Sequence, residues 1–123
     1  MFKKIAFTLY PITDVARARA FYEQTLGLTL SSHADHGDKH WLEYDLPGGG
    51  CLALADFVPD KPSANSGGTV AFEVEDLDAL MADLKAKGVE FRSDVIHSPV
   101  CRMAVCVDSE GNGLLLHQLK AKG

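Results

Sequence analysis

The chain has 123 residues, the usual length of one domain, so we expect a single core rather than two independent ones. Hydrophobic residues make up 46% and charged residues 24%, a balance typical of a globular protein and not of a disordered one. The formal net charge of −5 and the lack of any Lys/Arg cluster exclude nucleic acid as a partner, because phosphate binding needs a basic stripe.

The first half of the chain predicts a strand, a helix and three further strands. Alternating apolar residues predict a strand over residues 5–12. An amphipathic helix follows, with Thr13 or Asp14 as its N-cap and Gly27 as its stop. The remaining strands are predicted over residues 28–32, 41–46 and 51–57, with a polar turn over 33–40 and a glycine-rich hairpin loop over 47–50.

The second half repeats this order. A linker rich in Pro, Ser, Asn and Gly over residues 59–68 separates module one (1–58) from module two (69–123). A strand over residues 69–74 leads into a helix that Glu75 or Asp76 caps and Gly88 ends, and strands over 89–95, 103–107 and 114–119 complete the module. The repeat predicts one pseudo-symmetric domain.

The cysteines and the apolar runs indicate where the protein resides. The three cysteines are Cys51, Cys101 and Cys106, an odd number without C-x-x-C spacing, so we expect reduced thiols. No apolar run approaches the ~18 residues of a membrane helix. The N-terminal segment reaches Pro11 without a cleavage site of small residues, which argues against a signal peptide. We therefore expect a cytoplasmic protein with no membrane partner.

Several short motifs follow one another in a fixed order over nearly the whole chain. They are Thr13-Asp14-Val15, Ala20-Phe21-Tyr22, Leu26-Gly27-Leu28, Val74-Glu75-Asp76-Leu77 and Asp108-Ser109-Glu110-Gly111-Asn112. With the paired β-α-β-β-β order, they resemble the glyoxalase/bleomycin-resistance/dioxygenase group, the vicinal oxygen chelate superfamily. The resemblance implies an α+β fold in which two βαβββ modules in tandem form a curled, U-shaped mixed sheet with helices on the outer face. It also implies a homodimer.

The resemblance also implies where a metal would sit. Family enzymes hold a divalent ion on His or Glu ligands from four pocket-facing strands, where it acts as a Lewis acid. The matching positions are Phe7, Thr69, Leu115 and one near Ala53. None is a His or a carboxylate, so we expect no metal of the family type and predict no cofactor. A divalent metal held by non-standard ligands remains the alternative; its candidate ligands are His40, Glu43, Glu73 and His117.

If Phe7 faces a pocket, alternation places other side chains beside the four matching positions. These neighbours are Leu9 beside Phe7, Ala71 and Glu73 beside Thr69, and His117 beside Leu115. Apolar walls with a few polar groups are typical of a site for a small organic ligand. The alternative is that the pocket has filled with side chains and become core.

The second module contains candidate chemical groups. Glu73, His97, Arg102 and His117 could converge as an acid/base or anion-recognising group. The alternative is an ion pair between Glu73 and Arg102 with surface histidines. Cys101 is either a nucleophile with a lowered pKa or a buried small apolar residue.

Histidines are also frequent before the third predicted strand. His33, His36 and His40 invite a metal interpretation, but the flanking glycine and aspartates favour a solvated loop. His40, Trp41 and Glu43 lead into a strand that borders the pocket mouth in the family. Trp41 could stack on a planar ligand or lie in a dimer interface.

These observations lead to two functional hypotheses. The first is a metal-independent pocket that binds a small organic molecule, either to sequester it, as bleomycin-resistance proteins do, or to carry out an unidentified reaction. The second is a metal-dependent lyase, isomerase or dioxygenase that uses non-standard ligands. The fold alone does not choose between them, because one scaffold supports many chemistries.

Overall fold

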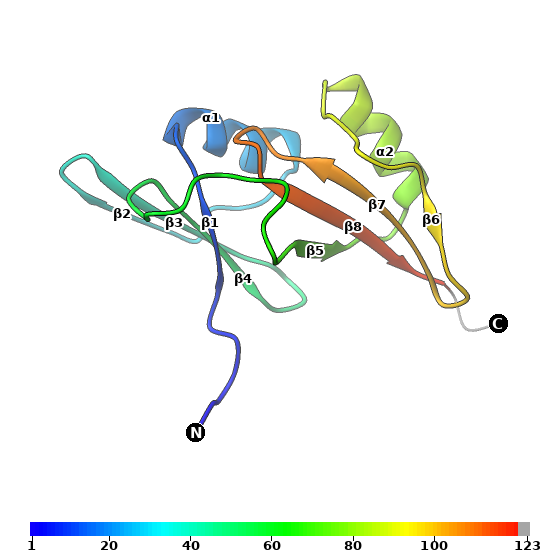
Figure 1. The fold of residues 1–123 in the computed structure, drawn as a ribbon, viewed down its shortest axis with the longest axis horizontal. Coiled ribbons are helices and arrows are strands. Elements are labelled where there is room, and N and C mark those ends of the chain that lie inside the picture. Colours follow the sequence, from blue (N-terminus) through cyan, green and yellow to red (C-terminus); the bar gives the residue numbers. More distant parts are fainter. Residues whose placement is uncertain (121–123) are drawn as a thin grey trace. The chain divides into compact units, whose positions relative to one another are not determined.

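The computed structural model describes residues 1–120 and contains two compact units, the first spanning Met1–Pro62 and the second beginning at Ser63. Each unit contains a four-stranded mixed sheet and a helical segment (Figure 1). The strand orders are β1-β4-β3-β2 and β5-β8-β7-β6, so the two units match strand for strand. The predicted tandem βαβββ modules are therefore confirmed.

The first unit consists of β1 (Thr8–Pro11), α1 (Val15–Arg19), the π-helix η1 (Ala20–Thr25), β2 (Ser32–His36), β3 (Lys39–Asp45) and β4 (Cys51–Ala55). The second consists of β5 (Val70–Glu73), α2 (Leu77–Ala86), β6 (Ile96–His97), β7 (Cys101–Val107) and β8 (Gly113–Leu119). In each unit the first strand pairs in parallel with the last, and the other pairings are antiparallel.

Both helices begin at the predicted aspartate. The Asp14 carboxylate accepts a hydrogen bond from the Arg17 amide at 3.0 Å, and the Asp76 carboxylate accepts one from the Ala79 amide at 3.0 Å. Each bond satisfies an amide that has no partner within the helix, which typically stabilises a helix by about 1 kcal/mol. The acidic N-cap is thus the local signal that starts the helix in both units.

Both helical segments end at the predicted glycine. Gly27 has φ 79° and Gly88 has φ 85°, which is the left-handed region where glycine costs least. The first segment differs in its last part, because the Leu26 amide donates to the Phe21 carbonyl, five residues earlier, at 2.9 Å. This π-helical stretch brings Phe21 and Tyr22 into the core together.

In the first unit, one face of the sheet packs against the helical segment. The Tyr44 hydroxyl of β3 donates to Glu23 of η1 at 2.9 Å, and Arg19 donates to the same carboxylate at 2.7 Å. The rings of Tyr22 and Tyr44 lie 5.9 Å apart. Tyr44 and its neighbours in register, Leu42, Leu52 and Leu54, are fully or almost fully buried, so this face forms the core of the unit.

In the second unit, α2 covers one face of its sheet in the same way. The Leu77 amide donates to the Gln118 side chain of β8 at 2.8 Å. Leu77 and Leu84 of the helix are completely buried, and so is Ala104 of β7. The interface therefore combines apolar burial with a polar contact that fixes where the helix begins on the sheet.

The motif from Asp108 to Asn112 forms a closed turn before β8. Asp108 accepts hydrogen bonds from the amides of Glu110 and Asn112, both at 2.8 Å. The Asn112 side chain in turn accepts the amide of Ser63 at 3.2 Å. Asp108 and Asn112 are both buried, so this motif has a structural role within the unit.

Two of the predicted strands were wrong. The second strand of the first unit is Ser32–His36, not residues 28–32, and it forms a hairpin with β3 across the predicted polar turn. Residues 89–95 form only an isolated bridge between Phe91 and Cys106, and the strand of this region is the two-residue β6. β2 is exposed at every residue, so it lacks the apolar pattern that marks a buried strand. Residues 89–95 do alternate Val89, Phe91 and Val95 with polar residues, but they pair with β7 only at the bridge of Phe91.

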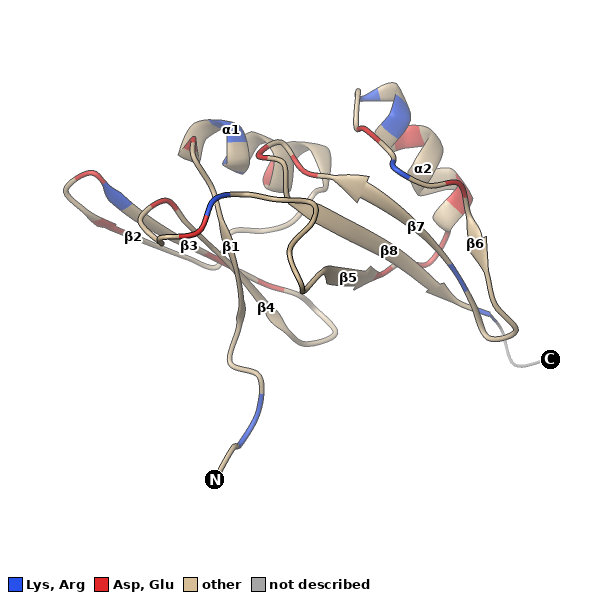
Figure 2. Ribbon diagram, viewed as in Figure 1, with Lys and Arg blue, Asp and Glu red and all other residues tan. Residues whose placement is uncertain are grey.

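Charged residues of both signs are distributed over both units (Figure 2). Acidic side chains stand at the start of α2, and basic ones stand toward its end. This arrangement complements the helix dipole. Within the part of the chain that the structure describes, no helix has the length and hydropathy needed to cross a membrane.

Candidate functional site

The face of the first sheet opposite the helix carries the group that we call the aromatic face, which consists of Phe7, Leu9, Trp41, Glu43 and Phe57. Leu9, Glu43 and Ala53 are cross-strand neighbours on β1, β3 and β4, so they share this face. The Phe7 and Trp41 rings meet edge to face with centroids 5.2 Å apart, and Phe57 lies 6.3 Å from Trp41. Three aromatic rings are thus adjacent.

The aromatic face is open to solvent at its edges. Phe7 is 43% exposed and Phe57 is 46% exposed, while Trp41 between them is half-buried. Large aromatic side chains usually bury most of their surface within a unit. The exposed edges of these rings therefore provide an apolar surface on which a planar molecule could stack.

A carboxylate fixes the orientation of the indole ring on this face. Trp41 Nε1 donates to Glu43 Oε2 at 2.7 Å, and the Cys51 thiol contacts Glu43 Oε1 at 3.7 Å. Burial raises the pKa of the Cys51 thiol to about 11, so this sulfur stays protonated at neutral pH. Trp41 is thus held in one geometry beside a negative charge, and the surface is pre-organised.

His40 does not share the aromatic face, because it precedes Trp41 in β3 and therefore points to the opposite side of the sheet. Its Nδ1 lies 2.6 Å from Asp56 Oδ2, and its amide donates to Asp56 Oδ1 at 2.8 Å. These two bonds tie the start of β3 to the residue that follows β4. The position of His40 indicates a structural role.

The other early histidines lie on strand β2 and not in the predicted loop. His33 contacts Asp35 within the same strand at 2.7 Å, and both side chains are largely exposed. His36 ends the strand at the turn around Gly37, which has φ 66°. The prediction of a solvated segment is consistent with this exposure, but the hairpin replaces the loop.

The face of the second sheet opposite α2 carries a second group, which we call the thiol cluster and which consists of Glu73, Ser98, Cys101 and His117. Glu73 and His117 are register partners on β5 and β8, and His117 Nδ1 contacts Glu73 Oε1 at 2.5 Å. The Cys101 thiol lies 3.1 Å from Ser98 Oγ. Cys101 is the diagonal neighbour of His117 on the same face of β7 and β8, because Cys101 pairs with Leu119 and Met103 pairs with His117. A carboxylate, an imidazole and a thiol thus lie on one face of the sheet.

These contacts shift the ionisation of the cluster in consistent directions. The hydrogen bond from Ser98, followed by that from His117, lowers the pKa of the Cys101 thiol. The hydrogen bond to Glu73 raises the pKa of His117, and the same bond lowers the pKa of Glu73. Each shift favours the charged form of its group.

Arg102 and His97 lie on the other side of this sheet, so the predicted convergence with Glu73 and His117 was wrong. Arg102 donates to Asp78 in the first turn of α2 at 2.6 Å, and His97 is its register partner. The alternative prediction of an ion pair between Glu73 and Arg102 was wrong as well. The reason is the alternation of side chains along β7. Met103 pairs with His117 and shares its face, so the adjacent Arg102 points to the opposite face.

The four positions that match family metal ligands lie on these same faces. Ala53 and Leu115 face away from the helices within β4 and β8, and Phe7 and Thr69 immediately precede β1 and β5. Their side chains are hydrocarbon, except for the Thr69 hydroxyl, and do not fit a divalent ion. Among residues 1–120, no three His, Cys, Asp or Glu side chains are grouped so that they could hold one.

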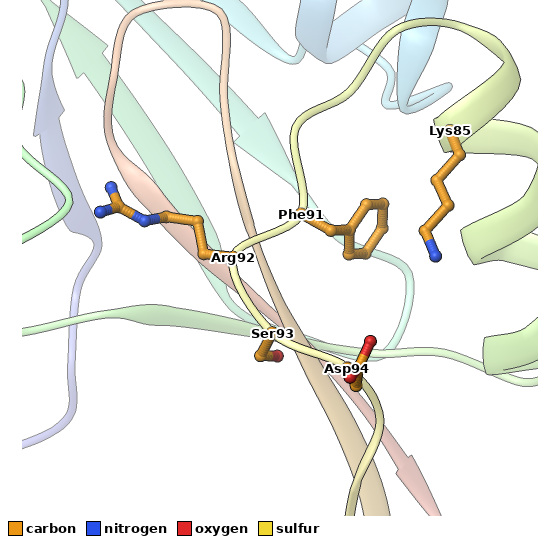
Figure 3. Close-up of a pocket in the computed structure, with 5 residues that line it drawn as sticks. All are labelled: Lys85, Phe91, Arg92, Ser93 and Asp94. Carbon is orange, nitrogen blue, oxygen red and sulfur yellow. The ribbon is translucent and has the colours of Figure 1, made fainter.

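The second unit also has a shallow groove beside α2. Figure 3 shows its lining residues, which are Lys85, Phe91, Arg92, Ser93 and Asp94. The Lys85 ammonium lies 5.4 Å from the centre of the Phe91 ring, a cation–π contact that covers the ring. The groove is wide open and contains both charge signs, so it does not define one ligand.

Phe57 and Ser98 belong to these two groups but were not predicted from the sequence. Phe57 ends the predicted strand 51–57, and alternation from Ala53 would have placed it on the aromatic face. Nothing in the sequence indicated Ser98, because its contact with Cys101 depends on the turn between β6 and β7. Short-range periodicity therefore reveals the first residue and not the second.

The fold consists of paired βαβββ modules, and the first module carries a largely apolar, aromatic face. The model of the Glyoxalase/Bleomycin resistance protein/Dioxygenase superfamily matches residues 4–116. The chain therefore belongs to this family. No curated protein matches the chain.

Solved structures of the same family resemble the chain over nearly its full length. TnmS3, an antibiotic binding protein from Streptomyces sp. CB03234, is 27% identical, with a TM-score of 0.82 over 97% of this chain and 98% of its own. A glyoxalase/bleomycin resistance protein from the same organism is 28% identical, with a TM-score of 0.73 over 92% and 100%. A glyoxalase family protein from Bacillus cereus is 19% identical, with a TM-score of 0.80 over 98% and 97%, which shows the fold alone.

The structural role of His40 can be tested through pH. The hydrogen bond to Asp56 raises the pKa of His40, so its contribution to stability is fully present below the ordinary value of 6.5 and is lost as the pH rises through the raised value. We expect Asp56→Asn to lower the melting temperature more at about pH 5.5 than at about pH 9, measured by thermal denaturation. Asp60→Asn, an exposed change of the same charge, is the control. A destabilisation that is independent of pH would contradict this role.

Proposed function

We propose that this protein binds a small planar organic molecule on the aromatic face, without a metal, and sequesters it. The observation that carries the proposal is the half-exposed group of Phe7, Trp41 and Phe57, with the indole ring held by Glu43. Aromatic surfaces with few polar groups are the usual composition of small-molecule sites. The relative named as an antibiotic binding protein supports the same kind of function.

The charge on the aromatic face narrows the class of ligand. Glu43 contributes a carboxylate at its centre, and Asp45 follows on the same face of β3. Lys39, the first residue of β3, shares this face, so the two carboxylates of the strand outnumber its one cation. The positively charged Arg19 and Arg17 belong to α1, on the helix side of the sheet. An anionic ligand would therefore be repelled, whereas a neutral or cationic aromatic molecule would gain from stacking and from the negative field.

The binding proposal can be tested with proflavine, a planar aromatic cation. Its binding should quench the fluorescence of Trp41, the only tryptophan of the chain. Because Phe7 supplies an edge-to-face ring, we expect Phe7→Leu to weaken binding about 5-fold. Phe2→Leu makes the same substitution at a ring that does not belong to the aromatic face and should leave the affinity unchanged.

A second variant tests the selectivity for charge. Glu43→Gln keeps an oxygen acceptor for Trp41 Nε1 but removes the negative charge. We expect it to weaken proflavine binding and to strengthen the binding of 1-pyrenesulfonate, a planar aromatic anion, in the same titration. Equal affinities of the native chain and of both aromatic-face variants for proflavine would overturn the proposed site.

Metal independence is the second part of the proposal. It is supported by the chemistry of the residues at the four family ligand positions, of which only Thr69 has a donor atom. We expect elemental analysis of the purified chain to find far less than one divalent ion per chain, and EDTA to leave proflavine affinity unchanged. One tightly held ion per chain, with binding lost on chelation, would instead support a metal enzyme with non-standard ligands.

We also propose that the protein is a homodimer in the cytoplasm. Free Cys51, Cys101 and Cys106 fit a reducing compartment. Exposed apolar side chains at Met1, Phe2 and Ile5 fit an interface with a second copy.

The dimer can be tested by sedimentation equilibrium. We expect a mass of twice 13.3 kDa at micromolar concentration, because exposed apolar residues gain free energy when a second copy covers them. The double variant Phe2→Ser, Ile5→Ser should dissociate at higher concentrations than the native chain, whereas Lys3→Ser, a polar change in the same segment, should not. A native chain that sediments as a monomer at all concentrations would refute the dimer.

A further inference from the structure

The proposed ligand site uses none of the residues of the thiol cluster. Its members come from β5, β8, β7 and the turn before β7, and all belong to the second unit. The aromatic face belongs to the first unit. The chemistry of the thiol cluster can therefore be considered on its own.

We propose that Cys101 is a nucleophile that adds covalently to small α,β-unsaturated carbonyl compounds, with His117 as its proton carrier and Glu73 as the group that positions His117. The geometry that supports this is the placement of these side chains on one face of the sheet. Glu73 contacts Nδ1 of His117, and Ser98 lies 3.1 Å from the sulfur. His117 and Cys101 are diagonal neighbours across β8 and β7. A nucleophile beside a base that a third group orients is the usual arrangement for covalent chemistry.

The carboxylate is held in place before any reaction. Glu73 Oε2 accepts the Leu119 amide at 2.9 Å, while Oε1 engages His117. The bond from the Leu119 amide ties the Glu73 carboxylate to β8, next to the His117 imidazole. Glu73 thereby holds the His117 ring in one orientation and favours its protonated form. Lys120, whose ammonium contacts the Ser98 carbonyl at 2.5 Å, is a further charged group of the described residues near the thiol.

The other cysteines restrict what this thiol can do. Cys106 lies on the opposite, helix-side face of β7, and burial raises its pKa to about 11. Cys51 belongs to the first unit. The second unit therefore has no partner thiol on this face, and a disulfide within it is excluded by geometry. Addition to a carbon electrophile requires no second cysteine.

Conjugate addition balances with the groups that are present. The Cys101 proton passes to His117, and the thiolate sulfur forms a bond to the β-carbon of the electrophile as the carbon–carbon π bond breaks. The electron pair moves to the α-carbon and carbonyl, and His117 returns the proton to the α-carbon. No oxidant, reductant or metal takes part, and the product is a thioether on Cys101.

Burial limits the size of the electrophile. Cys101 is 5% exposed, whereas the side chains of His117 and Glu73 are 28% and 53% exposed. The cluster therefore reaches solvent through the imidazole and the carboxylate. Only a small reagent can approach the sulfur from that side, which distinguishes this site from the aromatic face.

The proposal is tested with acrylamide, a small α,β-unsaturated carbonyl compound, by following adducts on each cysteine with peptide mass spectrometry. In the native chain at about pH 7, we expect Cys101 to react at least about 10-fold faster than Cys51 or Cys106. Cys101→Ser should remove the fast adduct. Reaction of Cys101 at or below the rate of the other two thiols would overturn the proposal.

Two further variants test the role of the proton carrier. His117→Gln should slow the Cys101 adduct by about 10-fold or more, because the general acid and base is lost. Glu73→Gln keeps an oxygen for the Leu119 amide and should move the alkaline limb of the rate–pH profile to lower pH, since His117 loses its charged partner. Glu75→Gln, at an exposed glutamate of the same unit, should leave the profile unchanged.

These readouts separate a chemical role from a structural one. A variant that only loosened the fold would expose all three thiols and accelerate their reactions together. An unchanged pH profile in Glu73→Gln, with Cys101 still fast, would exclude Glu73 as the positioning residue and overturn the relay. Proflavine affinity, measured in parallel, should remain at the native value in every thiol-cluster variant, so failure of this proposal is distinguishable from failure of the ligand site.

Discussion

Successive side chains of a strand point to opposite faces of its sheet, and the candidate sites of this protein depend on that constraint. In each unit one face is occupied by a helical segment, through Tyr44 and Glu23 in the first and through Gln118 and Leu77 in the second. Only the residues that point to the other face of the sheet are available to contact a ligand. The constraint therefore divides the residues of every strand into those that build the core and those that can meet a ligand.

The two remaining faces differ chemically although the units share one topology. The first carries aromatic rings around Glu43, which suits stacking, and the second carries Cys101 and His117, which suits proton transfer and nucleophilic attack. The aspartate caps, the glycine stops and the strand order are the same in both units. Differences at a few outward positions are thus enough to give one repeat two kinds of surface.

The sequence predicted the elements that depend on local signals. Asp14 and Asp76 cap helices because a carboxylate satisfies amides only two or three residues away. The strand prediction failed for β2 because this exposed segment carries no apolar period. It failed for residues 89–95 although Val89, Phe91 and Val95 alternate, because only Phe91 forms a bridge with β7. Their pairing depends on the neighbouring strand, which local patterns do not report.

The sequence by itself determined the module order, the family and the hydrocarbon side chains at Phe7, Ala53 and Leu115, where family enzymes place metal ligands. It also determined which residues of one strand share a face, because the period of two is local. Only the tertiary structure decided which partners meet across strands. Glu73 contacts His117, 44 positions away, and Arg102 contacts Asp78. The register between strands is set by packing and hydrogen bonds, and the alternation within one strand does not determine it.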